Sequence, residues 1–378
     1  MRFLHTADWH LGMSRRILSD EARPRFAEDR RTAVREIARI AQEEQVEFVV
    51  ACGDVFDANH LDRAEVARAV EAMGAFTVPL FLLPGNHDPL DAGSVYRSRA
   101  FTAACPDHVR VIAEPGPIVL RPGVEIVGVP WRTRRPAGDQ VAEVIAALPP
   151  APGTTRVLAA HGIVDDDAIA SGDDALIGHA ALTCALDAGL VDYVALGDHH
   201  STRQVGGDPR IRYPGTPEAT RSDEQEAGGV LIVDIGHGDG GLAVRRLDVG
   251  TWSFRREAFD LRSAEDVERF AAALDSARDK ERTVLRLDLA GSLSVAEDVR
   301  LHEVLDTRAD LFASLTVSDR TYDVAVMAGD NDIAALGLAG YARTAADEIA
   351  RVAAGGGDDA GAARDALRLL YRLAGGSA

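Results

Sequence analysis

The chain has 378 residues, 46% of them hydrophobic, which is enough for two domains with sizeable cores. The formal net charge of −19 argues against a protein that coats nucleic acid through a global positive field, although a nuclease that holds metal ions is not excluded. No apolar run approaches the roughly 18 residues of a membrane span, and the start of the chain, MRFLHTADWH, has no apolar stretch of signal-peptide length. With three scattered cysteines, Cys52, Cys105 and Cys184, we expect a cytoplasmic protein with reduced thiols.

Strands and helices alternate over the first 130 residues, and turns separate the strands that follow. Helices are predicted at residues 21–45 and 64–76, where apolar residues recur at helical spacing. Many short strands with this distribution of helices indicate an α/β fold in which two sheets pack face to face. The predicted strands are 2–5, 47–51, 78–83, 109–113, 117–120, 124–129, 156–160, 193–196, 210–213 and 230–235.

The pattern changes after residues 236–241, GHGDGG, which predict a hairpin turn. A compact β-α-β-α-β pattern follows, and from Asp332 the chain is Ala-rich and helical. The last helix is amphipathic, with Leu367, Leu370, Tyr371 and Leu373. We therefore expect a two-sheet β-sandwich flanked by helices over residues 1–243, a smaller α/β domain over 250–328, and a helical C-terminal segment over 331–378.

Polar residues directly follow five of the predicted strands, and each group lies next to a glycine. In α/β sheets the carboxyl ends of the strands are where ligands bind, and glycine lets the chain turn sharply there. A turn alone would need only Gly and Pro. The polar residues are Asp8 and His10, Asp54 and Asp57, Asn86 and His87, His161, and Asp198 to His200.

These side chains predict a metal centre. Carboxylate and amide oxygens mixed with imidazoles suit manganese, iron, zinc or magnesium. A single tetrahedral zinc needs four ligands, whereas seven, with Asp54 bridging, fit two ions about 3.5–4 Å apart, the arrangement used in phosphoryl transfer. The seven candidate ligands are Asp8, His10, Asp54, Asn86, His161, Asp198 and His200.

The series DWH, GDVFD, GNHD, HG and GDHH resembles the calcineurin-like metallophosphoesterase superfamily over about residues 1–240. More narrowly, LHTADWHLG at 4–12 and YPGTPEATRSDE at 213–224 are similar to segments of the SbcD family of DNA double-strand-break-repair nucleases. The β-α-β-α-β unit resembles that family's capping domain in position and size. The resemblance implies the same sandwich fold for the first domain.

The resemblance also implies a role for each residue of the site. Asp8, His10 and His200 would bind the first metal, and Asn86, His161 and Asp198 the second, with Asp54 bridging. His87 would be the general acid or stabilise the transition state, and Asp57 would orient it. The family's usual Gly-His-x-His is replaced here by Gly197-Asp198-His199-His200, and the extra carboxylate favours manganese. A register in which His199 replaces Asp198 as the ligand is the alternative.

The implied function is that of a manganese-dependent DNA exonuclease and endonuclease subunit of a double-strand-break repair complex. The chain contains no GxxxxGK[ST] loop, so ATP dependence would come from a coiled-coil ATPase partner of the SbcC type. The C-terminal helices would either dock that partner or pack on their own domain. A homodimer is a further expected assembly.

Two other interpretations stay open from sequence alone. The acidic chain favours a phosphodiesterase or phosphatase that acts on nucleotides or other small molecules at the same site. A scaffold that binds a partner and DNA ends without catalysis is disfavoured by the complete ligand set. DNA binding would need a local basic surface, and the candidates, against the alternative of solvated loops, are Arg15, Arg16, Arg132, Arg134 and Arg135.

Overall fold

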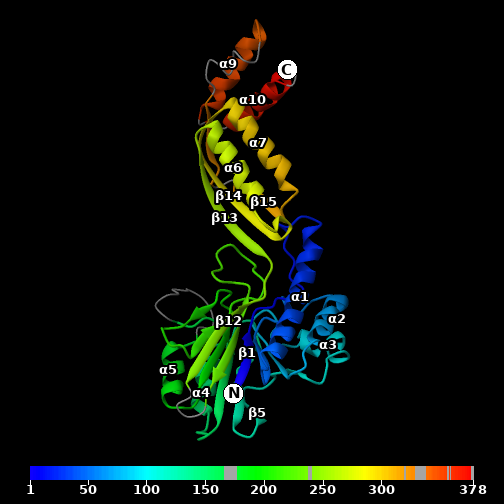
Figure 1. Ribbon diagram of the computed structural model, residues 1–378, viewed down its shortest axis with the longest axis vertical. Helices are drawn as coiled ribbons and strands as arrows, with labels where there is room; N and C mark the ends of the chain where they lie inside the picture. Colours follow the sequence, from blue (N-terminus) through cyan, green and yellow to red (C-terminus); the bar gives the residue numbers. More distant parts are fainter. Residues whose placement is uncertain are drawn as a thin grey trace. The chain divides into compact units, whose positions relative to one another are not determined.

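The computed structural model describes residues 1–165, 177–236, 241–318, 321–327, 338–355, 357 and 359–375 (Figure 1). The chain divides into two compact units. The first comprises Met1–Arg16 and Arg23–Trp252, and the second comprises Ile17–Ala22 and Ser253–Ala378. None of the described helices is long and apolar enough to cross a membrane.

The first unit contains two six-stranded sheets, with strand orders β12-β11-β1-β2-β3-β4 and β5-β6-β7-β8-β10-β9. The strands are β1 (Arg2–Thr6), β2 (Phe48–Cys52), β3 (Leu80–Leu83), β4 (Val109–Val111), β5 (Gly116–Arg121), β6 (Val124–Gly128), β7 (Thr155–His161), β8 (Tyr193–Gly197), β9 (Arg203–Gln204), β10 (Ile211–Tyr213), β11 (Gly229–Ile235) and β12 (Leu242–Asp248). The helices are α1 (Ala22–Glu43), α2 (Arg63–Met73), the 3₁₀ helix η1 (Val95–Arg97), α3 (Arg99–Thr102), α4 (Gln140–Ala147) and α5 (His179–Asp187).

The two sheets pack face to face, and helices cover their outer faces. Phe3 and Val50 of one sheet and Val157 and Ala195 of the other belong to the same buried cluster between the sheets. The neighbouring residue on each strand points the other way, because side chains alternate along a strand. The prediction of a mixed α/β fold with two large sheets flanked by helices is therefore confirmed.

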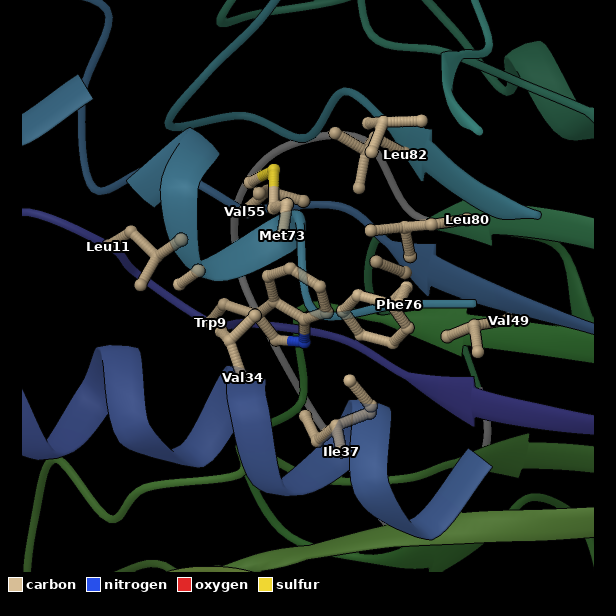
Figure 2. Close-up of a cluster of buried hydrophobic side chains, with 14 of the residues drawn as sticks. Trp9, Leu11, Val34, Ile37, Val49, Val55, Met73, Phe76, Leu80 and Leu82 are labelled. Atoms are coloured by element: carbon tan, nitrogen blue, oxygen red, sulfur yellow. The ribbon is translucent and has the colours of Figure 1, made fainter. Parts of the chain in front are cut away.

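The outer face of the first sheet carries the largest cluster, which α1 and α2 cover. In Figure 2, Trp9 lies among Val34 and Ile37 of α1, Phe76 and the sheet residue Val49. The rings of Trp9 and Phe76 stack with their centroids 6.3 Å apart. Trp9 lies between Asp8 and His10 in the loop after β1, so this core anchors the loop in which two of the predicted ligands lie.

The central strands run parallel, so their carboxyl ends share one edge of each sheet. β1 pairs in parallel with β2, and β2 with β3, while β7 pairs in parallel with β8. Every residue of these strands is buried except Arg2, because the parallel strands are covered on both faces. This topology brings the ends of five separate strands to one place.

The second unit is a four-stranded parallel sheet with helices packed on it. Its elements are β13 (Ser253–Leu261), α6 (Ala264–Ser276), the 3₁₀ helix η3 (Lys280–Arg282), β14 (Thr283–Ser294), α7 (Val295–Ala309), β15 (Ser314–Val317), β16 (Asp323–Met327), α9 (Tyr341–Ala353) and α10 (Ala360–Gly375). β14 pairs with β15 along its first half and with β16 along its second half. The unit thus has one strand more than the sequence pattern predicted.

The two C-terminal helices contribute to a core of the second unit. Ala346 and Ala350 of α9 and Leu367 of α10 are buried with Val295 and Val326. The adjacent Leu369 is 58% exposed. The predicted apolar positions Tyr371 and Leu373 have side chains outside the described residues, as do most residues of the predicted turn at 236–241.

Candidate metal centre

The structure brings the predicted ligands of five strand ends together. Asp8 and His10 follow β1, Asp54 follows β2, Asn86 follows β3, His161 ends β7, and Asp198 and His200 follow β8. Ligand atoms lie within 4.8 Å of one another in three groups among the described residues: Asp8–His10–His200, His10–Asp54–His87 and Asp8–Asp54–His161. Asp8, His10 and Asp54 are almost completely buried.

The loops that carry these ligands adopt an uncommon backbone conformation. Asp8, His10, Asp54 and Asp198 have positive φ angles of 56°, 46°, 51° and 93°. Such a conformation is strained for a residue other than glycine and persists only where the surroundings enforce it. Here the first two loops brace each other, because the Asp8 amide donates to the carbonyl of Gly53 (3.0 Å) and the His10 amide donates to that of Asp54 (2.9 Å).

Asp8, His10 and His200 form what we call the first cluster. The Nε2 atoms of His10 and His200 lie 3.1 Å apart. On the far side of each ring stands a carboxylate: Nδ1 of His10 is 3.2 Å from Asp57 Oδ1, and Nδ1 of His200 is 2.8 Å from Glu224 Oε1. A histidine that binds a metal through one nitrogen is usually oriented in this way through the other.

Asn86, His161 and Asp198 form the second cluster. His161 Nε2 lies 3.0 Å from Asn86 Oδ1 and 3.7 Å from Asp198 Oδ1. Its Nδ1 lies 2.8 Å from the carbonyl oxygen of Cys52, which fixes the ring so that Nε2 points to the cluster. Oxygen donors with one imidazole are a ligand set for a hard or borderline divalent ion.

Asp54 lies between the two clusters. Its Oδ1 is 3.4 Å from His161 Nε2, and its Oδ2 is 3.8 Å from His10 Nε2. One oxygen therefore faces each cluster, which is the disposition that a bridging carboxylate requires. The donor atoms and their supports fit a site for divalent cations.

Two glycines allow the clusters to approach so closely. A Cβ on Gly53 would lie 1.9 Å from the ring of His161, and Gly53 has a φ of +91°. A Cβ on Gly85 would lie 2.2 Å from Asp54 Oδ1. Any side chain at these positions would displace a candidate ligand, which explains why glycine accompanies the polar residues at the strand ends.

Burial and mutual charge shift the pKa values within the centre. Burial raises the pKa of Asp8 to about 7 and lowers the pKa of His10 to about 4. Burial alone would raise the pKa of Asp54, but His161, His10 and His87 hold it below its ordinary value. Burial opposes a charge on His161, yet the Asp54 carboxylate raises its pKa well above the usual range. The raised pKa values of Asp8 and His161 favour protons on these two side chains, and a bound cation would displace those protons.

Asp198 and His199 are placed differently. The Asp198 amide donates to the carboxylate of Asp8 at 3.1 Å, and its own carboxylate faces His161. The ring of His199 instead packs against Tyr213, with centroids 5.3 Å apart, and its Nδ1 lies 2.9 Å from the carbonyl of Ser201. This geometry favours Asp198 over His199 as a ligand of the second cluster.

His87 stands at the exposed side of the centre. Its backbone amide donates to Asp54 Oδ1 at 2.9 Å, and its Nε2 is 4.0 Å from Asp54 Oδ2. Nδ1 lies 2.8 Å from the backbone carbonyl of Asp57, whereas the Asp57 carboxylate is 4.0 Å away. Asp57 therefore contacts His87 through its backbone carbonyl, whereas its carboxylate contacts His10.

Sequence reasoning missed several residues that hold the loops. Asp88, the last residue of the GNHD motif, is buried and accepts hydrogen bonds from the amides of Gly85 (2.7 Å) and Phe56 (3.0 Å) and from the Tyr96 hydroxyl (2.6 Å). Burial raises the pKa of Asp88 to about 6. Glu224, which contacts Nδ1 of His200, was also missed. It is the last residue of the YPGTPEATRSDE segment that resembles the SbcD family, and that resemblance could have identified it as part of the site.

The basic candidates lie in two segments next to these loops. Trp131 donates from Nε1 to the carbonyl of His161 at 2.6 Å, which ties the start of the 131–135 segment to the centre. Arg132 then pairs with the exposed Glu114, while Arg134 and Arg135 are exposed. The second segment follows the Asp8 and His10 loop; in it Arg16 is exposed and Arg15 is half-buried.

Comparison with curated proteins finds D subunits of the nuclease SbcCD and a DNA double-strand break repair protein. The D subunit of the nuclease SbcCD from Escherichia coli (strain K12) is 27% identical over 267 residues, which cover 59% of this chain and 62% of that protein. The corresponding SbcCD protein of Rhodobacter capsulatus is 29% identical, over 65% of this chain and 69% of that protein. The DNA double-strand break repair protein Mre11 of Archaeoglobus fulgidus is 36% identical over 91 residues, 23% of this chain and 19% of that protein. The match thus spans under two thirds of the E. coli protein's length.

Solved structures also match the chain. TT1561 of Thermus thermophilus superposes with a TM-score of 0.42 at 12% identity, over 66% of this chain and 98% of that one. The purple acid phosphatase PPD1 of yellow lupin gives a TM-score of 0.39 at 11% identity, over 66% of this chain and 51% of that one. A family model described as calcineurin-like phosphoesterase matches residues 1–202, and these contain every candidate ligand. The chain therefore belongs to the calcineurin-like phosphoesterase family.

Proposed function

We propose that this chain is a phosphodiesterase that uses two divalent metal ions and acts as the DNA nuclease subunit of a double-strand-break repair complex. The observation that carries the proposal is the position of Asp54, with one oxygen toward His161 and the other toward His10. The similarity to proteins named as subunits of the nuclease SbcCD supports DNA as the substrate.

Two ions held here would supply an activated water and neutralise the charge that develops on a phosphoryl group. The protein's part is to fix the ligands and keep the centre shielded. Asp57 and Glu224 orient the histidines of the first cluster, and the Cys52 carbonyl orients His161. We propose manganese as the native ion, because oxygen donors dominate the second cluster.

His87 is proposed as the general acid or transition-state donor. With Nδ1 held by the Asp57 carbonyl, Nε2 is the nitrogen that is directed to the centre. A protonated Nε2 can donate to the leaving oxygen of a phosphodiester, a role for which an imidazole is suited near neutral pH. Its half-exposed position would let a bulky substrate reach it.

A coiled-coil ATPase of the SbcC type is the proposed partner, since the chain itself has no nucleotide-binding loop motif. The exposed Leu369 on α10 is consistent with a contact there. Leu367 of the same helix packs within the second unit, so a partner would meet only part of the helix. A homodimer and a cytoplasmic location complete the proposal.

The test is a substrate panel in Mn²⁺. Double-stranded DNA, single-stranded DNA, a cyclic dinucleotide, bis-p-nitrophenyl phosphate and p-nitrophenyl phosphate are each offered to the purified chain, alone and with a coiled-coil ATPase of the SbcC type from the same organism. We expect cleavage of DNA and of the phosphodiester ester. Hydrolysis of the cyclic dinucleotide without cleavage of DNA would overturn the nuclease assignment.

A small phosphodiester is the second candidate substrate, and the charge of −19 and the pairing of Arg132 with Glu114 favour it. The two are separated by neutralising Arg134 and Arg135 together, with Arg15 and Arg16 as a second pair. If these arginines contact phosphates, the salt dependence of DNA binding falls by roughly 0.7–0.9 log units per lost contact, while the ester is hydrolysed as before. DNA cleavage equal to wild type at every salt concentration would favour the small substrate.

A further inference from the structure

Arg30 of α1 is a buried cation whose hydrogen bonds go to backbone carbonyls. Arg30 is 2% exposed, and among the described residues its guanidinium forms no salt bridge, so Glu218, Asp57 and Glu224 act on it only from a longer distance. The guanidinium lies over the ring of Phe26, with its carbon 4.7 Å from the centroid, and its Nε has no hydrogen-bond partner among them. A buried charge is normally paired, so this arrangement needs an explanation.

The guanidinium joins two loops that are far apart in sequence. Nη1 donates to the carbonyl of Trp9 at 2.7 Å, and Nη2 donates to the carbonyl of Glu218 at 3.1 Å. Trp9 stands between Asp8 and His10, both of which have positive φ angles. The indole of Trp9 packs in the core beside Val34 and Ile37 of α1 (Figure 2). Helix α1 therefore holds both the side chain of Trp9 and, through Arg30, its backbone carbonyl.

The loop of Glu218 supports the remaining ligand of the first cluster. The Thr216 hydroxyl contacts the carbonyl of Asp8 at 2.8 Å and that of Glu218 at 2.9 Å. The Thr216 amide donates to the carbonyl of His200 at 3.0 Å. Further along the same segment, Glu224 meets Nδ1 of His200. One segment therefore touches both loops of the first cluster, and Arg30 binds that segment to the Asp8–His10 loop.

We propose that Arg30 is a positioning residue of the first metal site. It fixes the carbonyls on either side of the cluster, so that Asp8, His10 and His200 stay in ligand geometry before a cation binds. This inference rests on the proposed metal centre and extends it to a residue that touches neither ion nor substrate. The second cluster makes no contact with Arg30 and should not depend on it.

Electrostatics agrees with this role. Burial lowers the pKa of Arg30 to about 10, while Glu218, Asp57 and Glu224 oppose that shift, so the guanidinium keeps its charge at neutral pH. Asp57 and Glu224 are the two carboxylates that orient His10 and His200. The positive charge of Arg30 thus stabilises the negative charges of Asp57 and Glu224, which support the first cluster.

The test replaces Arg30 by Met, which keeps the stem over Phe26 and removes both donors, and by Lys, which keeps the charge but cannot reach both carbonyls at once. The matched control is Arg31→Met on the same helix, because Arg31 pairs with Glu28 and Glu65 instead. Mn²⁺ binding is followed by calorimetry, and bis-p-nitrophenyl phosphate hydrolysis is measured against Mn²⁺ concentration. Thermal unfolding without metal reports on folding.

We expect Arg30→Met to weaken one of two Mn²⁺ sites by about 10–100-fold, as changes behind a ligand shell do, with the other site unaltered. The turnover number should recover at saturating Mn²⁺, Arg30→Lys should lie between, and Arg31→Met should match wild type. If Arg30→Met does not fold, Arg30→Lys tests the same contacts, and Thr216→Val tests the neighbouring link between the carbonyls of Asp8 and Glu218. Two sites of wild-type affinity in the folded variants would overturn the inference, whereas a wild type that binds no metal would overturn the proposed centre itself.

Discussion

The two clusters of the candidate metal centre are supported in different ways. Behind the histidines of the first cluster stand the carboxylates of Asp57 and Glu224. Behind His161 of the second cluster is a backbone carbonyl, and the carboxylate of Asp198 is 26% exposed. The histidines of the first cluster are oriented by side chains from distant segments, whereas His161 of the second cluster is oriented by the backbone at the end of β2. Substitutions should therefore affect the two clusters through different residues.

The substitution with the largest expected effect is at Asp54, and it should weaken both clusters equally. Asp54→Asn should abolish tight binding of both ions and activity with them, because each oxygen of Asp54 faces one cluster. Elemental analysis and calorimetry with Mn²⁺ measure the loss. Asp234→Asn is the control, since that carboxylate pairs with Arg2 instead. Retention of one ion at wild-type affinity would show that Asp54 does not bridge.

His87→Ala should lower turnover and leave both clusters loaded. We expect a decrease in turnover of about 10²–10⁴-fold, the range for a lost general acid. The control is His199→Ala, which removes a partly exposed imidazole whose ring packs against Tyr213, and it should leave turnover near wild type. Elemental analysis that finds both metals missing from the His87 variant would reassign His87 to the ligands.

Asp198→Ala should affect the second cluster alone. We expect the affinity of one ion to fall by about 100-fold or more, because removal of a ligand should cost at least as much as the largest losses seen for residues that only support ligands. Asp198→His should restore binding and shift preference toward softer ions, which a titration with Mn²⁺ and Zn²⁺ would show. Unchanged affinity here, combined with a loss in His199→Ala, would identify His199 as the ligand.

Glu224→Gln should give the smallest effect, confined to the first cluster. The amide can still accept from His200 but carries no charge, so affinity for one ion should fall by about tenfold, the lower end for outer contacts. The neighbouring Asp223 is exposed and pairs with Arg221, which makes Asp223→Asn a matched control. Equal losses at both ions would mean that the clusters are not supported independently.

Much of the fold could be predicted because parallel strands buried on both faces are continuous apolar runs, as at Phe48–Cys52 and Leu80–Leu83. The polar residues that end them marked the candidate centre. The contacts behind the ligands could not be predicted, since they join positions as distant as Arg30 and Glu218. β16 was missed because its five residues are few, and because β14 is long enough to pair with β15 along its first half and with β16 along its second, which the sequence does not show.

The left-handed backbone at four candidate ligands has a consequence for the evolution and engineering of this chain. Each such non-glycine residue costs on the order of 1–3 kcal/mol of folding free energy. Glycine would relieve the strain at Asp198, where φ is 93°. Selection for thermal stability of the metal-free protein would therefore favour glycine at these positions and remove the ligands. Stability and metal binding make opposite demands on the same residues, so a more stable variant found at these positions is expected to be an inactive one.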